Sequence, residues 1–204
     1  MNRVLIGIIL ILIGLFGIWF FFLRNNSVEK VTKQGPIIFF GNSITAGVGA
    51  SEGNDFPSLI AKELNLTSVI NAGIAGDTTT TALARLQTDV LAKNPSLVVV
   101  ELSGNDFLQQ TPADQTIKNL DSIVRQIYET GAAVILIHIN FPRNSATYKE
   151  GFENIAKKYK AQVLLNSLEG ITGNQTLMAD ELHPNARGYK ILAGKIAKMI
   201  EKII

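Results

Sequence analysis

The chain lacks cysteine altogether and contains only two histidines, His138 and His183. Without cysteine, no lipid anchor can be attached through a thiol, and redox reasoning leaves the compartment open. An excess of one charge sign is also missing. Three of the 19 basic and one of the 17 acidic residues lie within residues 1–30, which leaves sixteen of each sign beyond them. A neutral domain has no basic footprint for nucleic acid, so we expect no such partner.

Apolar residues are plentiful but unevenly distributed. They make up 47% of the 204 residues, which is ample for one packed domain and argues against disorder. Val4 to Leu23 is a run of 20 residues without a single charge. At about 1.5 Å rise per residue this run spans roughly 30 Å, the thickness of the hydrocarbon core of a bilayer. It predicts one N-terminal transmembrane helix.

A cleaved signal peptide is the alternative interpretation, because Arg3 precedes the apolar run. The run ends in Trp-Phe-Phe-Phe-Leu, which offers no small-residue cleavage site. We therefore expect a membrane anchor over residues 1–24, a linker over 25–35 and a folded domain over 36–204. The charge rule alone would keep the domain inside, whereas a short basic tail before one helix resembles a bacterial export signal. We expect a single-pass protein of the cell membrane with an extracytoplasmic domain, secreted if the segment is cleaved.

From Pro36 onward, apolar runs of strand length alternate with longer segments of helical period. The predicted strands cover residues 37–40, 68–71, 97–102, 133–139 and 162–165. The predicted helices cover residues 56–64, 77–93, 112–130, 148–160 and 184–203. Asp77 is expected to cap the second helix, Pro112 to open the third, and Gly131 to follow its end.

The predicted strands are β-branched and almost continuously apolar, which is typical of a parallel sheet buried on both faces. Strict alternation with helices predicts an α/β fold, a three-layer α/β/α sandwich with a mostly five-stranded parallel sheet. Ligands of such sheets bind beyond the carboxyl ends of the strands. Polar turns at residues 40–47, 71–77, 103–106 and 138–142 all fall at this edge.

One of these turns carries a candidate nucleophile. The sequence FGNSITAG places Ser43 directly after the first strand, and a serine hydroxyl needs a base that a third group orients. His183 lies in DELHPN, three residues after Asp180, so the carboxylate can fold back on the imidazole within one turn. This pair could equally belong to a polar surface loop. His138 is expected to be a hydrogen-bonded histidine at the end of a buried strand, near enough to line the site.

Two further turns offer donors for an oxyanion. NAGIAGD, residues 71–77, supplies glycine amides just before a predicted helix, where free N–H groups point outward. SGND, residues 103–106, supplies the carboxamide of Asn105. Each good donor stabilises a transition state by roughly 3 kcal/mol. Taken singly these are ordinary turns, but together they place a nucleophile, donors and an Asp/His pair in order along one edge.

Four ordered blocks, FGNSITAG, NAGIAGDTTTTALARL, VVVELSGND and DELHPN, carry a resemblance to a known family. The chain resembles an SGNH hydrolase of the GDSL type, within its thioesterase I/lysophospholipase/arylesterase branch, from about residue 36 to the end. The resemblance implies a flavodoxin-like sandwich. It also implies Ser43 as nucleophile, His183 as general base, Asp180 as the orienting acid, and Ser43, Gly76 and Asn105 as the oxyanion hole. No metal and no organic cofactor are implied.

The blocks depart from the family pattern at one position, because the usual Asp before the serine is Asn42 here. We expect this change to alter loop hydrogen bonding more than chemistry. Glu101, at the end of the third strand, is a second carboxylate within reach of the site, and is expected to be a paired strand residue. Loops over residues 107–111 and 141–147 are expected to shape specificity.

The sequence thus predicts a membrane-anchored serine esterase that cleaves acyl esters or thioesters, such as lysophospholipids, through an acyl-enzyme. A deacetylase of O-acetylated cell-surface glycans would use the same residues. A membrane-tethered, flavodoxin-like binding module is the alternative from another class, although the loop after Phe40 lacks the GxxxxGK[ST] pattern of a phosphate-binding loop.

Overall fold

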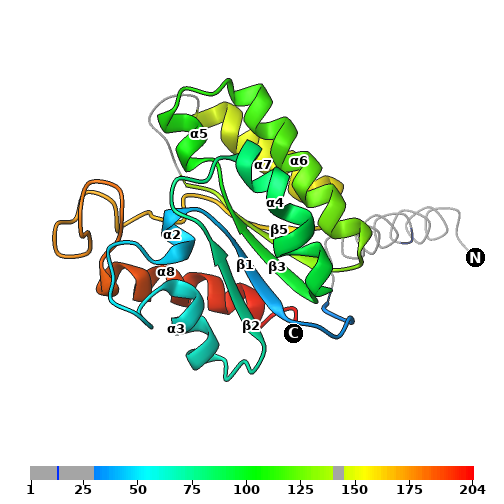
Figure 1. Ribbon diagram of the computed structural model, residues 1–204, viewed down its shortest axis with the longest axis horizontal. Helices are drawn as coiled ribbons and strands as arrows, with labels where there is room; N and C mark the ends of the chain where they lie inside the picture. The colour runs from blue at the N-terminus through cyan, green and yellow to red at the C-terminus, as the bar shows by residue number, and fades with distance from the viewer. Residues whose placement is uncertain (1–12, 14–29, 140–144) are drawn as a thin grey trace, which may run out of the picture.

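Figure 1 shows the computed structural model, which describes residue 13, residues 30–139 and residues 145–204. The predicted span from Val4 to Leu23 lies outside the described residues except for Ile13, and so do residues 25–29 of the predicted linker. In the described ranges, the helices are all too short or too polar to cross a bilayer. The predicted anchor therefore stays a prediction.

Five parallel strands form the single sheet of the described chain. They are β1 (Ile37–Gly41), β2 (Val69–Gly73), β3 (Leu97–Glu101), β4 (Ala133–Ile137) and β5 (Gln162–Leu164), in the spatial order β2-β1-β3-β4-β5. Gly41 at the end of β1 lies opposite both Gly73 of β2 and Glu101 of β3. The carboxyl ends of the three strands therefore meet at one place. The predicted parallel five-stranded sheet is confirmed.

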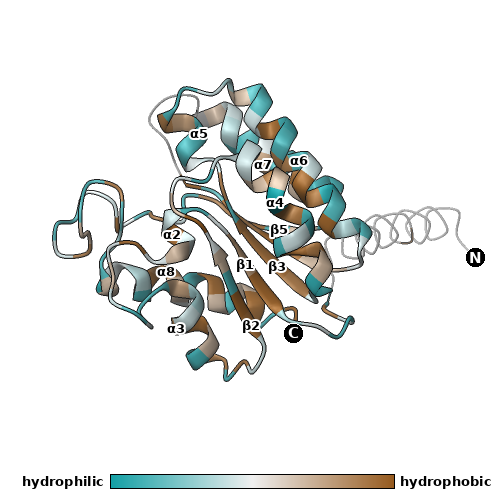
Figure 2. Cartoon of the chain, in the orientation of Figure 1, coloured by the Kyte–Doolittle hydropathy of each residue, from teal (hydrophilic) through white to brown (hydrophobic). Residues whose placement is uncertain are grey.

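Helices cover both faces of the sheet, as the alternation of its side chains requires. Ile38, Phe40 and Val100 point toward α4 (Thr79–Asp89), α6 (Ala113–Glu129) and α7 (Ser145–Lys158). Phe39 and Val99 point the other way, toward α3 (Phe56–Glu63) and α8 (Ala186–Ile200). Figure 1 shows these two helical layers, and Figure 2 shows that the strands between them are apolar. The predicted three-layer sandwich is confirmed.

Two short helices follow strands at the functional edge and were not expected from the sequence. They are α2 (Ser43–Ala46), separated from β1 by one residue, and α5 (Gly104–Leu108), separated from β3 by two residues. Four or five residues are too few for a periodic pattern, so a sequence signal exists only in their caps. Gly47, in the left-handed region with φ 87°, ends α2. This conformation suits glycine, which has no Cβ to clash.

The predicted helix starts need small corrections. Thr78, not Asp77, caps α4, because its hydroxyl and that of Thr81 form a reciprocal capping box. This helix ends at Asp89 and a separate 3₁₀ turn, η1 (Leu91–Lys93), replaces the rest of the predicted helix. Pro112 immediately precedes the first residue of α6, and Gly131, with φ 79°, follows its end as expected.

The last helix is shorter than predicted. It begins at Ala186 because the side chain of Asn185 caps it, accepting from the N–H groups of Arg187 and Gly188. Beyond Ile200 the chain turns, and Ile203 O accepts a hydrogen bond from Val31 N (2.7 Å). The described chain therefore enters the domain beside its own C-terminus, at the amino ends of the strands, opposite the functional edge (Figure 1).

Candidate active site

Ser43 is the first residue of α2 and projects from a tight turn after β1. Asn42 caps this helix, with its Oδ1 accepting from Ile44 N (2.9 Å). The end of β2 lies close against the helix, since a Cβ at Gly73 would stand 2.3 Å from Ala46 N. Only glycine permits that approach. The turn is thus fixed from both sides and holds the hydroxyl at the carboxyl edge of the sheet.

His183 meets this hydroxyl from the far end of the chain. Its Nε2 lies 2.9 Å from Ser43 Oγ, although the two residues are 140 positions apart. Its Nδ1 lies 2.8 Å from Asp180 Oδ2 and 3.0 Å from Oδ1. The hydrogen bond from His183, together with the N–H groups of Leu182 and His183, lowers the pKa of Asp180 to about 2. The acid is therefore a carboxylate at neutral pH and an acceptor for an imidazole N–H.

The loop that carries His183 is fastened to the loop that follows α2. The hydroxyl of Tyr189, on α8, donates to Val48 O (2.7 Å). A Cβ at Gly49 would stand 2.6 Å from Pro184 O and 3.1 Å from His183 Cβ, so glycine is needed for this contact. These contacts hold the imidazole and the hydroxyl in register.

The predicted oxyanion donors line the same cavity as the hydroxyl. This cavity has a volume of about 490 Å³, and Ser43, Gly76, Asn105 and His183 are among its lining residues. Gly76 has φ 86°, a conformation suited to glycine. Asn105 donates one amide hydrogen to Asp77 O (2.8 Å), which fixes its carboxamide next to the Gly76 turn. Within the described residues, its second amide hydrogen is left for a ligand.

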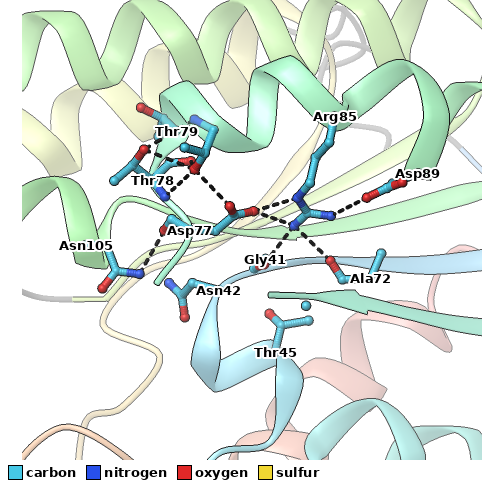
Figure 3. A network of polar contacts seen from close by, with 12 residues as sticks. Gly41, Asn42, Thr45, Ala72, Asp77, Thr78, Thr79, Arg85, Asp89 and Asn105 are labelled. Carbon is cyan, nitrogen blue, oxygen red and sulfur yellow. Dashed lines mark hydrogen bonds and ion pairs between the residues drawn. The ribbon is translucent and has the colours of Figure 1, made fainter. Parts of the chain in front are cut away.

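Arg85 holds the Gly76 turn to the strands, which sequence reasoning missed. Its Nε donates to Asp77 Oδ2 (2.6 Å), its Nη1 to Asp89 Oδ2 (2.9 Å), and its Nη2 to Gly41 O and Ala72 O (3.1 and 3.0 Å). Figure 3 shows how this one guanidinium joins α4 to the ends of β1 and β2. A planar fork with five donors is suited to such a task.

Comparison with known proteins decides the family. The sequence model of the GDSL-like Lipase/Acylhydrolase family matches residues 39–191. The chain belongs to this family. It is 31% identical over 182 residues to the thioesterase 1/protease 1/lysophospholipase L1 of Escherichia coli K12, covering 86% of this chain and 88% of that protein. It is 35% identical over 158 residues to the esterase TesA of Pseudomonas aeruginosa PAO1, covering 72% and 79%.

Solved structures agree with this assignment. The crystal structure of TesA superposes with a TM-score of 0.78 at 30% identity, covering 83% of this chain and 99% of that one. The chain is therefore an SGNH/GDSL serine hydrolase with the SGNH hydrolase fold, related to esterases, thioesterases and lysophospholipases. This kinship favours an enzyme over the tethered binding module that the sequence left open.

In this SGNH hydrolase, Glu101 lies directly behind the turn that carries Ser43. It is 1% exposed, and it accepts hydrogen bonds from Asn42 Nδ2 to Oε1 and from Thr45 Oγ1 to Oε2, both 3.0 Å. Burial raises the pKa of Glu101 to about 8, although both hydrogen bonds act in the opposite direction. The expectation of a paired strand residue is confirmed, and Asn42 is one of its partners.

His138 is a buried core residue of the hydrolase, as predicted. It is 1% exposed, its ring packs edge-on against Phe152, and its Nδ1 accepts from Asn166 N (3.5 Å). Burial, and to a lesser extent the charge of Lys149, lowers the pKa of His138 to about 4. The cavity beside Ser43 is lined by the next residue, Ile139, and not by His138.

Large apolar side chains line much of the remaining cavity of this hydrolase, together with the polar residues Asn42, Thr172 and Glu181. The apolar residues are Ile44, Val48, Phe107, Leu108, Ile139, Leu168 and Leu182. Phe107 and Leu108 belong to the first of the two predicted specificity loops, whereas residues 141–144 of the second lie outside the described residues. Leu182 was not expected there, because its place beside His183 gave no signal of its own.

No cluster of three or more potential metal ligands occurs among the residues that the structure describes. The polar groups around Ser43 pair with one another instead, as the contacts of His183, Asn105 and Glu101 show. Such an arrangement is suited to proton transfer between a hydroxyl, an imidazole and a carboxylate.

Proposed function

We propose that this chain hydrolyses carboxylic esters or thioesters with Ser43 as nucleophile, His183 as general base and Asp180 as the acid that orients the base. The observation that carries the proposal is the 2.9 Å contact between His183 Nε2 and Ser43 Oγ. A base at hydrogen-bonding distance, held from behind by an ionised carboxylate, is what a serine hydroxyl needs to become a nucleophile.

The reaction proceeds in two halves. Ser43 Oγ attacks the acyl carbon while its proton passes to His183 Nε2, and the imidazolium then gives this proton to the departing alcohol or thiol. The resulting acyl-enzyme is attacked by water, whose proton passes to His183 Nε2 and then to Ser43 Oγ as the acid leaves. Both tetrahedral intermediates carry an oxyanion, for which the N–H groups of Ser43 and Gly76 and the Asn105 carboxamide are the proposed donors. Each donor stabilises the transition state by about 3 kcal/mol.

The cavity supports a substrate with an apolar acyl group. Its volume of about 490 Å³ and its apolar wall, which includes Phe107, Leu108 and Leu182, are typical of small-molecule sites that bury a hydrocarbon moiety. Leu108 and Leu182 are about half exposed, at 52% and 50%. An apolar chain seated there would cover both. Acyl thioesters and lysophospholipids, after which the Escherichia coli relative is named, fit this description.

Residues 4–23 would attach the hydrolase to the cell membrane, with the domain outside the cytoplasm. Val31 N is bonded to Ile203 O and Lys33 Nζ to Thr130 O, both at the amino ends of the strands. Residues 24–29 extend over at most about 20 Å. The carboxyl edge with Ser43 would therefore face away from the membrane that holds the anchor. This orientation favours substrates that reach the site through water over lipids packed in the same bilayer.

The test is hydrolysis of a panel of p-nitrophenyl esters and acyl thioesters, from acetyl to palmitoyl, by the full chain and by Ser43→Ala. We expect turnover by the wild type and none above background by the variant, with both showing the same circular dichroism spectrum. Activity that survives in a folded Ser43→Ala protein would refute the mechanism. A preference for acetyl over all longer chains would instead indicate a deacetylase of O-acetylated glycans.

A further inference from the structure

Glu101 is a buried ionisable group that contacts the nucleophile turn, residues 42–45, and the mechanism above does not use it. It ends β3 opposite Gly41, the last residue of β1, and is 1% exposed. We propose that Glu101 is a positioning residue for Ser43, and that loss of its proton sets the alkaline limit of the reaction. This inference rests on the proposed function and adds a residue to it.

The contacts of Glu101 reach both ends of the nucleophile turn. Asn42 Nδ2 donates to Oε1, and the same Asn42 caps α2 by accepting from Ile44 N (2.9 Å). Thr45 Oγ1 donates to Oε2, and Thr45 O accepts from Asn71 Nδ2 (2.9 Å). One carboxyl group therefore holds the residue before Ser43 and the residue two positions after it, so its removal frees the backbone that aims Oγ.

Both protonation states of Glu101 can keep these contacts. The amide of Asn42 can donate to a neutral carboxyl or to a carboxylate. The hydroxyl of Thr45 donates to a carboxylate, and accepts from a protonated carboxyl, since a hydroxyl can play either part. Titration therefore changes the charge behind the turn without breaking the hydrogen bonds. Burial, which raises the pKa of Glu101 to about 8, puts this change in the range where esterases are assayed.

The charges around Glu101 do not neutralise an anion there. Arg85, which reaches the neighbouring Gly41 carbonyl, is engaged by Asp77 and Asp89. On the side of α8, burial raises the pKa of Tyr189 far above its ordinary value, and the charge of Glu101 adds to that rise.

Two more acids lie on the same side of the turn. Asp55 and Asp180 also contribute to the raised pKa of Tyr189, after burial and Glu101. His138, which follows the β4 neighbour of Glu101, has its pKa lowered to about 4 by burial and stays neutral. An ionised Glu101 would thus add one more negative charge behind residues 42 and 45, which flank the proposed oxyanion donor Ser43 N, while Asp180 already balances the imidazolium of His183. The barrier to oxyanion formation rises accordingly.

The experiment compares pH profiles of kcat and kcat/KM from pH 5 to 10 for the wild type and Glu101→Gln. A short p-nitrophenyl ester serves as substrate, with product read at a pH-independent wavelength. The wild type should lose activity on the alkaline side with an apparent pKa near 8. Glu101→Gln mimics the neutral acid and should keep its activity through this range. An unchanged alkaline decline in Glu101→Gln would overturn the proposal.

A second variant tests positioning apart from charge. Glu101→Ala should lower kcat by about 10- to 100-fold, as expected for a misaimed nucleophile, with KM within about threefold. Glu101→Gln should recover most of that loss. A folded Glu101→Ala enzyme with the kcat of the wild type would contradict the positioning role. Should Glu101→Ala fail to fold, the pH profile of Glu101→Gln still decides.

Tyr189→Phe is the matched control, because it removes a titratable group whose pKa the charge of Glu101 raises. Its alkaline decline should remain, and its disappearance would assign the decline to Tyr189 and overturn the proposal. The proposed function fails separately: wild-type turnover that Ser43→Ala retains would refute the nucleophile, whatever the Glu101 variants do. If Ser43→Ala abolishes the turnover of the wild type, the proposed function stands, and the Glu101 variants then test only the role of Glu101.

Discussion

Two carboxyl groups serve the Ser43 site from opposite surroundings. Asp180 lies on an exposed loop, with 55% of its side chain accessible, and hydrogen bonds lower its pKa to about 2. Glu101 lies in the sheet at 1% exposure, and burial raises its pKa to about 8. Environment alone separates two groups of the same chemistry, one suited to orient a base as an anion and the other to support the nucleophile turn as a neutral acid.

We expect the largest loss of activity from a substitution of Asp180. Asp180→Asn should lower kcat by about 10³- to 10⁴-fold, since a carboxamide neither fixes the imidazole tautomer nor balances its positive charge. Steady-state kinetics on a short ester measures this loss. The unfolding free energy should fall only slightly, because solvent screens the pair that the half-exposed carboxylate forms with His183. A loss of less than tenfold would show that Asp180 does not orient His183.

For Glu101 we expect the opposite balance, with a large effect on the unfolding free energy. Its pKa is 4.5 when unfolded and about 8 when folded, so the folded state binds the proton more tightly. The stability that this proton gives is complete below pH 4.5 and is lost as the pH rises through about 8. Relative to Glu101→Gln, the wild type should therefore lose a few kcal/mol of unfolding free energy across this window.

Urea unfolding of both proteins at pH 5, 7 and 9 measures that difference. His138 acts in the opposite direction between pH 6.5 and about 4, so only the difference between the two proteins isolates Glu101. Asp180 is the contrasting case. Its lowered pKa gives stability above pH 3.8 that is lost only as the pH falls toward 2. If the unfolding free energies of the wild type and Glu101→Gln change with pH in parallel, Glu101 does not have the raised pKa that distinguishes it from Asp180.

Arg85 is a cation that, like Glu101, supports the site from a largely buried position. Its side chain is 14% exposed and that of Asp77 is 7% exposed, so Arg85→Lys leaves a buried carboxylate with weaker support. We expect a loss of about 2 kcal/mol in unfolding free energy and about tenfold in kcat, because the Gly76 turn loses its tether. Arg125→Lys is the control. Its pair with Glu129 is exposed, and the change should stay within about 0.5 kcal/mol. Equal effects of both variants would contradict the tether.

The smallest expected effect concerns Ser103, which lies two residues beyond Glu101, the last residue of β3. It has φ 97°, a strained value for serine, and its buried hydroxyl finds no hydrogen-bond partner in the described part of the chain. Ser103→Gly should raise Tm by about 2 to 4 °C, through relief of roughly 1 kcal/mol. Gln110→Gly is the control, because Gln110 has φ 60° but an exposed side chain. A larger gain in the control would exclude the buried hydroxyl as a cause.

The two carboxyl groups also differ in how well the sequence predicts their contacts. Asp180 and His183 are three residues apart, so their contact is local and DELHPN predicts it. Their meeting with Ser43 was predictable because strand order places polar turns at one edge of a parallel sheet. The strand ranges and the layers followed from the pattern of apolar residues. This pattern does not mark where a strand stops, so the strand boundaries shifted by one or two residues.

The contacts that fix the site depend on packing between distant elements, which no local pattern encodes. Arg85 reads as a surface residue of an amphipathic helix, yet it reaches two strand ends. Glu101 reads as an anomaly within an apolar strand, and only the register with β1 shows that Asn42 and Thr45 lie over it. The short helices α2 and α5 escaped prediction because a single turn has no period.

The most direct test of the account treats the full chain with a fluorophosphonate at neutral pH and locates the adduct by mass spectrometry. We predict one phosphonyl group, on Ser43, formed much more slowly in Asp180→Asn and not at all in Ser43→Ala. An adduct on another residue, or none on a wild-type protein that still hydrolyses esters, would contradict the assignment of Ser43 as nucleophile.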